Sequence, residues 1–302
     1  MRQNRLGRSD LTVSVVGLGC NNFGRRLDRA GTRAVIDAAR DAGITFLDTA
    51  DIYGGDGASE RLIGEALEGR RDRVVLATKF GMDAGRDGGE PRGSRAYARR
   101  SLEDSLQRLR TDRVDLLYYH EHDGVTPLAE TLGALGELAD EGKIRAFGVS
   151  NLDAGQLREA IAVGDPRLAA LQNEYSLLER GAERELLPLC REHRIGFVPY
   201  FPLARGRLTG KFRRGEPLPA GTRMADRPDL LTDAVFDRLE ALEAFAAERG
   251  HTLLELAFAG LASQPGVASV IAGAMSPEQV AGNVAAGAWE LGEADLRALA
   301  AL

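Results

Sequence analysis

Four side chains with complementary acid–base chemistry stand at, or just beyond, the ends of hydrophobic runs. Asp48, Lys79 and His120 each end such a run, and Tyr53 follows Asp48 in the adjoining loop. Taken singly, each residue has an ordinary structural explanation. The carboxyl ends of parallel strands meet at one face of an α/β barrel, where the catalytic residues of that fold gather. We therefore expect these four residues, called the tetrad below, to converge at one mouth of a barrel.

The tetrad is suited to proton transfer to an oxygen that gains negative charge. A free tyrosine has a pKa of about 10, which is too high for efficient proton exchange near neutral pH. The ammonium of Lys79 would lower the pKa of Tyr53 by favouring the phenolate. Asp48 would keep that ammonium charged and fixed, and His120 would hydrogen-bond a substrate oxygen. Carbonyl reduction requires this stabilisation of developing charge on oxygen.

Hydrophobic runs alternate with helical patterns along the chain. The predicted strands are residues 14–19, 44–48, 74–78, 114–119, 144–149, 169–172, 195–199 and 267–271. The predicted helices are residues 32–42, 58–69, 94–109, 127–141, 153–163, 182–193, 232–262 with a break at 250–251, 277–287 and 293–301. Alternating strands and helices form right-handed parallel units, and eight of them are typical of a TIM barrel. We predict a (β/α)8 barrel with a short N-terminal β-hairpin and extra helices, forming one domain over residues 1–302.

Composition argues against several classes of function. The net charge of -6 disfavours nucleic acid as a general partner, because phosphate binding needs basic faces. No signal-peptide core follows Met1, and no apolar run approaches the roughly 20 residues of a membrane helix. Cys20 and Cys190 have no close cysteine partner, so neither a disulfide framework nor a zinc site is expected. These features predict a cytoplasmic protein with reduced thiols and no bound metal.

Motifs in consistent order across nearly the whole chain resemble those of the aldo-keto reductase family, in its bacterial type. They are Gly17-Leu18-Gly19, Leu47-Asp48-Thr49-Ala50 with Tyr53-Gly54, Ala77-Thr78-Lys79, Asp112-Arg113-Val114-Asp115-Leu116 leading to His120, Gly148-Val149-Ser150-Asn151, Gln172-Asn173-Glu174-Tyr175, the stretch from Pro202 to Lys211, and Ser276-Pro277-Glu278-Gln279. The resemblance implies a TIM barrel that binds a nicotinamide dinucleotide without a Rossmann fold. It also implies that Tyr53 is the general acid–base, that Lys79 and Asp48 tune it, and that His120 orients the substrate.

The resemblance further implies NADP(H) as cofactor, with NAD(H) as the alternative, and a small-molecule carbonyl or alcohol as substrate. Ser150, Asn151 and Gln172 match the family's contacts to the nicotinamide carboxamide, and Tyr200 matches the aromatic residue that stacks on the ring. The full set of positions matched to cofactor contacts is Gly19, Asp48, Ser150, Asn151, Gln172, Tyr200, Pro202, Leu203, Gly206, Leu208, Lys211, Arg223, Gly273, Ala274, Met275, Gln279 and Asn283. The physiological substrate and the oligomeric state are not readable from the sequence.

Cofactor choice is where this sequence departs from the family pattern. Relatives selective for the 2′-phosphate of NADP(H) often carry a cation near residues 273–279, and this stretch contains none. A phosphate is best bound by arginine or lysine. Recognition is therefore expected to depend on Lys211 and Arg223 in the long loop, giving an NADPH preference weaker than in such relatives.

Two other functions stay open at this stage. A metal-dependent barrel hydrolase could use His120 and His122 as ligands at a strand end, although only two other histidines exist to complete such a site. A regulatory subunit that binds the cofactor without appreciable turnover is the second alternative, because some relatives of this fold serve mainly as partners of other proteins.

Overall fold

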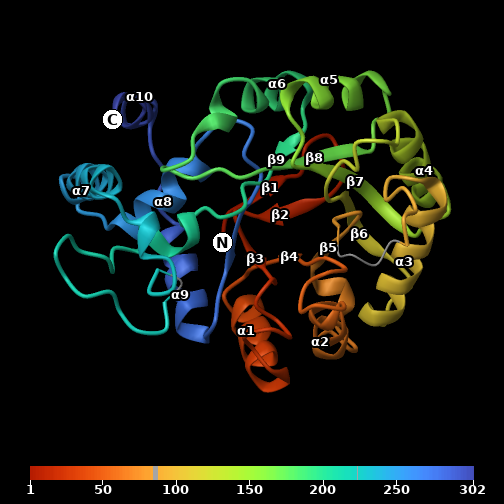
Figure 1. Ribbon diagram of the computed structural model, residues 1–302, viewed down its shortest axis with the longest axis horizontal. Helices are drawn as coiled ribbons and strands as arrows, with labels where there is room; N and C mark the ends of the chain where they lie inside the picture. The colour runs from red at the N-terminus through yellow and green to blue at the C-terminus, as the bar shows by residue number, and fades with distance from the viewer. Residues whose placement is uncertain (84–87, 223) are drawn as a thin grey trace.

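A computed structural model of the chain shows a closed barrel of parallel strands surrounded by helices (Figure 1). The structure describes residues 1–83, 88–222 and 224–302. The barrel strands pair in the order β10-β3-β4-β5-β6-β7-β8-β9. They are β3 (Val16–Gly19), β4 (Phe46–Asp48), β5 (Val75–Phe80), β6 (Val114–Tyr119), β7 (Ile144–Ser150), β8 (Leu168–Gln172), β9 (Gly196–Phe197) and β10 (Val270–Gly273).

The last strand connection closes the barrel. Phe197 of β9 bridges in parallel to Val267, and the amide of Ala268 donates to the Phe197 carbonyl at 2.8 Å. The predicted TIM barrel is therefore confirmed. Strand β9 is shorter than the predicted run at 195–199, although the Val198 amide still donates to the Leu171 carbonyl at 2.8 Å and the Pro199 carbonyl accepts from Ile271 at 3.4 Å.

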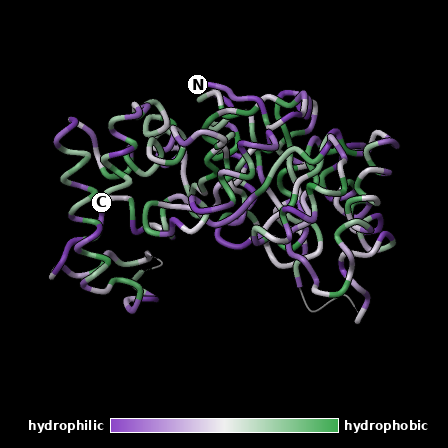
Figure 2. The backbone as a smooth tube through the Cα atoms, turned by 90° about the horizontal axis from the view of Figure 1, so that it is seen from above, coloured by the Kyte–Doolittle hydropathy of each residue, from purple (hydrophilic) through white to green (hydrophobic). Residues whose placement is uncertain are grey.

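Helices cover the outside of the barrel, as Figure 1 shows. They are α1 (Arg29–Asp41), α2 (Ala58–Ala66), α3 (Arg95–Leu109), α4 (Leu128–Asp140), α5 (Ala154–Ala162), α6 (Leu186–His193), α8 (Leu253–Ala262) and α9 (Pro277–Ala286). The extra helices are α7 (Asp233–Ala247) and α10 (Glu293–Ala301). In α1 the buried residues Thr32, Val35, Ile36 and Ala39 follow the spacing of one helix face. Hydrophilic residues accordingly gather on outward turns and helix faces (Figure 2).

The helical break predicted at 250–251 has a local cause. Gly250 has a φ of 74°, which ends the first helix in a left-handed turn. Thr252 and Glu255 then form a capping box that begins α8. None of the helices within the described residues is long and apolar enough to cross a membrane.

The predicted N-terminal hairpin closes the bottom of the barrel. Its strands are β1 (Gln3–Arg5) and β2 (Thr12–Ser14), paired antiparallel. Leu6, Leu11 and Val13 are buried against the inward-facing residues of the strands. With one end filled in this way, the other end, at the strand C-termini, is available for a cleft.

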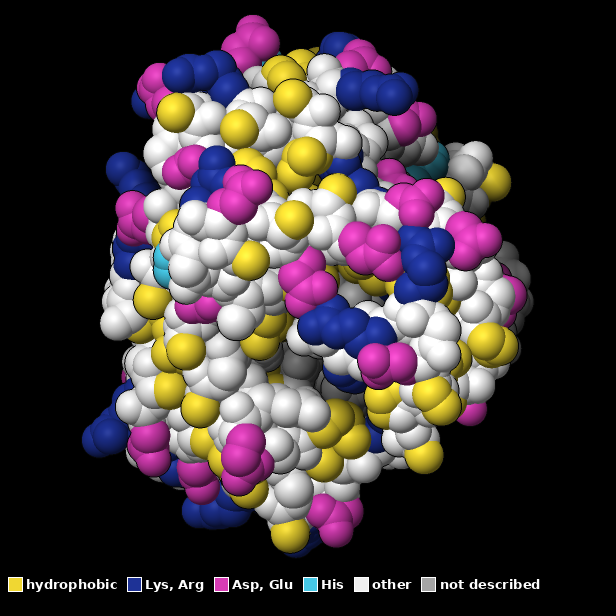
Figure 3. Space-filling model, turned by 90° about the vertical axis from the view of Figure 1, so that its left-hand side faces the viewer, with side chains coloured by type: hydrophobic (Ala, Val, Ile, Leu, Met, Phe, Trp, Pro, Cys, Tyr) yellow, Lys and Arg dark blue, Asp and Glu magenta, His cyan; other side chains and the backbone are white. Residues whose placement is uncertain are grey.

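The long loop from Tyr200 to Leu231 is tied to the face formed by α7. On this face, basic and acidic side chains stand next to one another (Figure 3). Arg213 in the loop pairs with Glu243 of α7, and Arg214 contacts Glu240 at 3.0 Å. Short helical turns, η3 (Ala204–Thr209) and η4 (Pro228–Leu230), further order the loop. These contacts fix the described parts of the loop, residues 200–222 and 224–231, beside the C-terminal mouth of the barrel.

Candidate active site

The C-terminal mouth of the barrel opens into a cleft of about 940 Å³. Asp48, Tyr53 and His120 line it, and Lys79 lies fully buried beneath. Strand register brings these residues together, since Asp48 on β4 pairs with Ala77 on β5. Strand β5 pairs in turn with β6, which ends next to His120. The structure therefore brings the four side chains of the tetrad together at this mouth.

Lys79 contacts both Asp48 and Tyr53 and so connects three members of the tetrad. Its ammonium donates to the Asp48 carboxylate and to the Thr49 carbonyl at 2.8 Å, and lies 3.5 Å from the Tyr53 hydroxyl. The second Asp48 oxygen accepts a hydrogen bond from the Gln172 amide at 2.8 Å. Burial lowers the pKa of Lys79, but the Asp48 carboxylate and Tyr53 outweigh it, so the net pKa is raised and the ammonium stays charged.

The pKa of Tyr53 is shifted in the opposite direction to the one that the sequence predicted. Burial raises the pKa of the phenol, and the opposing charge of Lys79 only partly offsets that effect. The net pKa lies above its ordinary value rather than below it. Tyr53 consequently keeps its proton at neutral pH, which is the state a proton donor needs.

His120 is held in its neutral form. Burial and then the charge of Lys79 hold its pKa well below the usual value. Its ring lies edge-on to Tyr53, with centroids 6.0 Å apart. The buried Nδ1 has no hydrogen-bond partner among the described residues, so no protein group fixes the tautomer from that side. A neutral imidazole can donate a hydrogen bond to a substrate oxygen without adding a positive charge.

A connected set of polar side chains continues from the tetrad along the cleft. Ser150 donates to the Gln172 carbonyl at 2.7 Å, and Asn151 donates to the His120 carbonyl at 3.0 Å. The hydroxyl of Tyr200 donates to the Asn151 side-chain oxygen at 2.8 Å. Asn151 has a φ of 57°, an unusual backbone conformation that asparagine tolerates better than most residues. These residues are the ones matched to the nicotinamide end of a cofactor.

The other predicted cofactor positions divide into three groups. Those that line the cleft are Gly19, Pro202, Leu203, Gly206, Lys211, Gly273, Met275, Gln279 and Asn283. Leu208 and Ala274 do not line it, because both are buried in the hydrophobic core. Arg223 lies outside the described residues.

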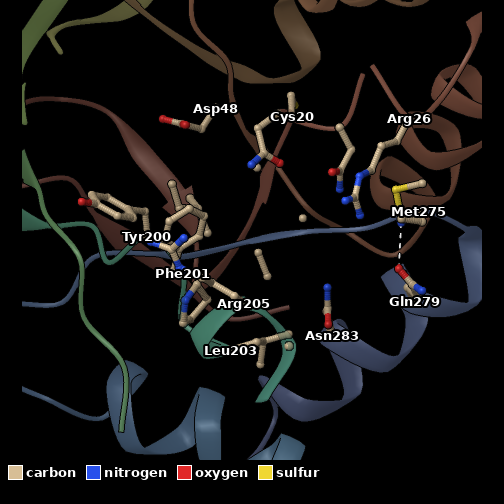
Figure 4. Close-up of a pocket in the computed structure, with 18 of the residues that line it drawn as sticks. Cys20, Arg26, Asp48, Tyr200, Phe201, Leu203, Arg205, Met275, Gln279 and Asn283 are labelled. Carbon is tan, nitrogen blue, oxygen red and sulfur yellow. Dashed lines mark hydrogen bonds between the residues drawn. The ribbon is translucent and has the colours of Figure 1, made fainter. Parts of the chain in front are cut away.

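Figure 4 shows how the labelled residues lie around the cleft. Tyr200, Phe201, Leu203 and Arg205 come from the long loop, opposite Asp48 and Cys20. Met275, Gln279 and Asn283 mark the far end, where the Met275 amide donates to the Gln279 side chain at 2.8 Å. The cleft thus extends from the tetrad to the start of α9, as an elongated ligand requires.

A nicotinamide dinucleotide fits this arrangement. The cleft volume lies within the ordinary range for ligand sites, about 300–1,000 Å³. Gly273 lies against the loop after β3, and a β-carbon there would come within 3.1 Å of the Asn22 amide nitrogen. A larger residue would therefore press on the wall of the cleft at its far end.

Comparison with known proteins decides the family. The sequence profile of the Aldo/keto reductase family matches residues 15–302. The chain belongs to this family. It is 36% identical over 305 residues to the uncharacterized oxidoreductase YqkF of Bacillus subtilis, covering 99% of this chain and 95% of the relative. It is also 37% identical over 305 residues to a probable voltage-gated potassium channel subunit beta of Oryza sativa, covering 95% and 91%.

Solved structures of aldo-keto reductases have the same fold. The glycerol dehydrogenase of Gluconobacter oxydans superposes with a TM-score of 0.86 at 31% identity, covering 99% of this chain and 94% of the other. An aldo/keto reductase from Klebsiella pneumoniae in complex with NADP and acetate has a TM-score of 0.78 at 32% identity, covering 99% and 94%. This chain is accordingly an oxidoreductase of the aldo-keto reductase family, with relatives whose structures contain NADP.

The metal-site alternative finds little support in the residues present. Both ring nitrogens of His122 are engaged by backbone groups of its own loop, Thr126 at 3.1 Å and Gly124 at 3.2 Å. No group of three or more potential metal ligands occurs within residues 1–83, 88–222 and 224–302. The pair of histidines identified in the sequence is therefore left without the further ligands that a protein metal site needs.

The cleft also contains residues to which the sequence assigned no catalytic or cofactor role, although two of them, Arg205 and Glu278, lie inside the matched motifs. They include Asn21, Asn22, Arg26, Met82, Glu121, Phe201, Arg205 and Glu278. Loops carry no periodic pattern, so their positions depend on how the closed barrel presents them. The only signal in the sequence was position, since residues 20–27 and the loop from 200 follow predicted strands directly.

A pair of carboxylates lies behind the tetrad, between the loop after β4 and helices α2 and α3. Asp51 accepts a hydrogen bond from Ser101 at 3.1 Å, and its other oxygen has no partner among the described residues. Glu60 is fully buried and accepts from Arg108 at 2.6 Å. Burial, and then the charge of Glu60, raise the pKa of Asp51 to about 7.

We expect Asp51→Asn to stabilise the protein at alkaline pH. Because the pKa of Asp51 is higher in the folded state, the folded state binds its proton more tightly. Stability is then lost as the pH rises from 3.8 to about 7. Asparagine does not ionise, so the variant escapes a loss of about 1.4 kcal/mol per pKa unit, a few kcal/mol at most. Urea unfolding at about pH 5 and about pH 8.5 measures the effect. An advantage no larger at the higher pH would contradict it.

Proposed function

We propose that this aldo-keto reductase uses NADP(H) to reduce a small aldehyde or ketone, or to oxidise the corresponding alcohol. The observation that carries the proposal is the position of the buried Lys79 ammonium. It donates a hydrogen bond to the Asp48 carboxylate and lies 3.5 Å from the Tyr53 hydroxyl. A protonated phenol beside a fixed positive charge is suited to donating a proton to an oxygen that becomes negative.

Each member of the tetrad has a distinct part in this proposal. Tyr53 holds the proton that passes to the substrate oxygen, and Lys79 stabilises the phenolate that remains. Asp48 compensates the buried ammonium, which would otherwise be costly to desolvate. His120, being neutral, donates a hydrogen bond that positions the carbonyl oxygen near the phenol.

Nicotinamide dinucleotide, when bound, supplies the hydride. Ser150, Asn151 and Gln172 would hold its carboxamide, and Tyr200 would pack against the ring. Pro202, Leu203, Gly206 and Lys211 would lie along its pyrophosphate. The complex of the Klebsiella pneumoniae relative with NADP supports this choice of cofactor.

The substrate end of the cleft is bounded by Met82 and Glu121. The Glu121 carboxylate, directly after His120, disfavours substrates that carry a negative charge close to the carbonyl. We therefore infer a neutral substrate. The likeness to a glycerol dehydrogenase makes small polyols and their carbonyl forms worth including in a test.

The test is a panel of neutral and anionic aldehydes, ketones and polyols, assayed with NADPH and with NADH. We expect oxidation of NADPH with at least one neutral carbonyl compound, and weaker activity with its carboxylated analogue. A purified protein that turns over no member of the panel would count against the enzyme assignment.

A cofactor-binding regulatory role is the second candidate. It is favoured by the 37% identity to a probable potassium channel subunit beta. The convergence of the four tetrad side chains at one mouth of the barrel, with Lys79 contacting both Asp48 and Tyr53, favours catalysis instead. Tight NADPH binding without turnover of any carbonyl would decide for the regulatory role.

A further inference from the structure

Arg26 reaches the far end of the cleft from a part of the sequence that carries no cofactor motif. It lies in the loop between β3 and α1 and lines the same cleft as Met275 and Gln279. Figure 4 shows its side chain directed into the cleft on the side of Met275. The Asn22 amide, from the same loop, lies against Gly273, which places this loop next to the 273–279 segment.

The guanidinium of Arg26 is exposed and engages no hydrogen-bond or ion-pair partner within the described part of the chain. Some other surface arginines are compensated, as Arg213 is by Glu243 and Arg99 is by Glu141. An unpaired cation that lines a ligand cleft is available to bind an anion without first breaking an existing pair.

The other basic side chains that line the described cleft lie along the long loop. Arg205 stacks over the Phe201 ring, 4.7 Å from its centroid. Lys211 lies close to Gly206, where a β-carbon would stand 3.8 Å from its amine. Lys211 therefore belongs to the part of the cleft assigned to the pyrophosphate, and Arg205 lies between that part and an adjoining cavity that Arg26 also lines. Arg26 is the described cation that serves the Met275 end.

The residues at the Met275 end of the cleft provide no positive charge of their own for a bound phosphate. Met275 and Gln279 are uncharged, and Glu278 adds an exposed carboxylate to the lining. A phosphate bound there would meet this negative charge with no basic group on the same segment. An arginine from the facing loop can offset the repulsion and form a charge-assisted hydrogen bond with the phosphate.

The backbone around Arg26 is held in place by hydrogen bonds and packing. The Asn22 carbonyl accepts hydrogen bonds from the amides of Arg25, Arg26 and Leu27, at 3.3, 2.9 and 3.1 Å. Gly24 has a φ of 72°, and a β-carbon there would come within 2.5 Å of the Ala58 side chain. The tight turn packs on the start of α2, so Arg26 is presented from a constant position.

We propose that Arg26 recognises the 2′-phosphate of NADP(H) and sets the preference for NADP(H) over NAD(H). This inference rests on the proposed function, because it requires that the cleft bind a nicotinamide dinucleotide. It places the selecting cation in the β3–α1 loop rather than in the 273–279 segment or at Lys211 and Arg223, where the sequence suggested it.

The experiment compares dissociation constants for NADPH and NADH, and for adenosine 2′,5′-bisphosphate and 5′-AMP, in wild type and Arg26→Gln. Isothermal titration calorimetry at one fixed ionic strength gives all four without need of turnover. We expect Arg26→Gln to weaken both ligands that carry the 2′-phosphate by about tenfold or more. We expect its affinities for NADH and 5′-AMP to change by less than about threefold, since they lack that phosphate.

Arg25→Gln is the matched control, because Arg25 belongs to the same turn but lines an adjoining cavity rather than the cleft. It removes the same charge and should leave the NADPH to NADH ratio unchanged. A second arm adds Met275→Arg to the Arg26→Gln variant. A guanidinium restored at this end of the cleft should recover most of the lost preference.

Each outcome has a definite meaning. A ratio of NADPH to NADH affinity that is the same in Arg26→Gln as in wild type overturns the inference and leaves the proposed function intact. Equal losses for ligands with and without the 2′-phosphate also overturn it, because they indicate a general effect on the cleft. Wild type that binds neither dinucleotide overturns both the inference and the choice of cofactor.

Discussion

Replacing Tyr53 with phenylalanine is expected to abolish most carbonyl reduction while leaving cofactor binding intact. Phenylalanine preserves the ring that faces His120 edge-on at 6.0 Å and removes only the hydroxyl beside Lys79. A positioned general acid contributes about 100- to 10,000-fold to rate, so turnover should fall within that range. Carbonyl-dependent oxidation of NADPH measures the loss, and calorimetric titration measures cofactor affinity separately.

Tyr175→Phe provides the matched control for loss of a buried phenol hydroxyl. Tyr175 is buried away from the cleft, and its hydroxyl donates to Glu183 at 2.8 Å. The control should cost about 1 kcal/mol of stability and leave turnover unchanged. Turnover of Tyr53→Phe close to that of wild type would remove Tyr53 from the role of proton donor.

The raised pKa of Tyr53 gives the two reaction directions opposite pH dependence. Reduction needs the protonated phenol, so its rate should be level through neutral pH and fall only in the alkaline range. Oxidation of an alcohol needs the phenolate, so its rate should rise with pH toward the raised pKa. The sequence had predicted a lowered pKa and therefore a transition nearer neutrality.

That difference shows what a list of neighbours in the sequence leaves out. The presence of Lys79 near Tyr53 was predictable, because both follow adjacent parallel strands whose ends meet at one face. The depth at which the phenol lies was not. Burial acts on the charged form of every ionisable group, and at Tyr53 it outweighs the attraction of the ammonium.

The barrel itself was largely readable from alternating patterns of hydrophobic residues. Strand β6 (Val114–Tyr119) and helix α10 (Glu293–Ala301) begin and end where the sequence predicted. Closure of the barrel was harder to predict from the sequence, because β9 spans only Gly196–Phe197 and pairs through a single bridge to Val267. Such pairing depends on the whole ring of strands and not on local sequence.

The starts of two helices likewise differ in how well the sequence predicts them. Ser94 begins α3, and its hydroxyl accepts a hydrogen bond from the Tyr97 amide at 3.2 Å, in keeping with the predicted opening of that helix. Ser59, which has the same chemistry near the start of α2, is instead turned inward and donates to the Cys20 carbonyl at 3.0 Å. A buried acceptor competes for the hydroxyl, and Gly57 takes the capping position. Sequence alone does not indicate which partner a serine will choose.

Removing the charge of Lys79 is the second change with a large expected effect. Lys79→Met takes away the ammonium that lowers the phenol pKa, so the pKa of Tyr53 should rise further. Tyr53 then becomes a weaker acid, and each pKa unit corresponds to about 1.4 kcal/mol of lost differential stabilisation. Reduction should become much slower, and the pH profile of residual alcohol oxidation should move to higher pH.

Stability must be separated from chemistry in this variant. Asp48 is 1% exposed and would be left without its cation, which typically costs about 3–5 kcal/mol when one partner of a buried pair is removed. The double variant Asp48→Asn/Lys79→Met leaves no uncompensated charge and should recover much of that stability. Because it restores no cation beside Tyr53, it should recover neither turnover nor the original pH profile. A double variant with the wild-type pH profile would show that the phenol is tuned by something other than Lys79. A slow double variant whose oxidation rises only at higher pH would identify the ammonium as the group that makes Tyr53 usable as an acid and base.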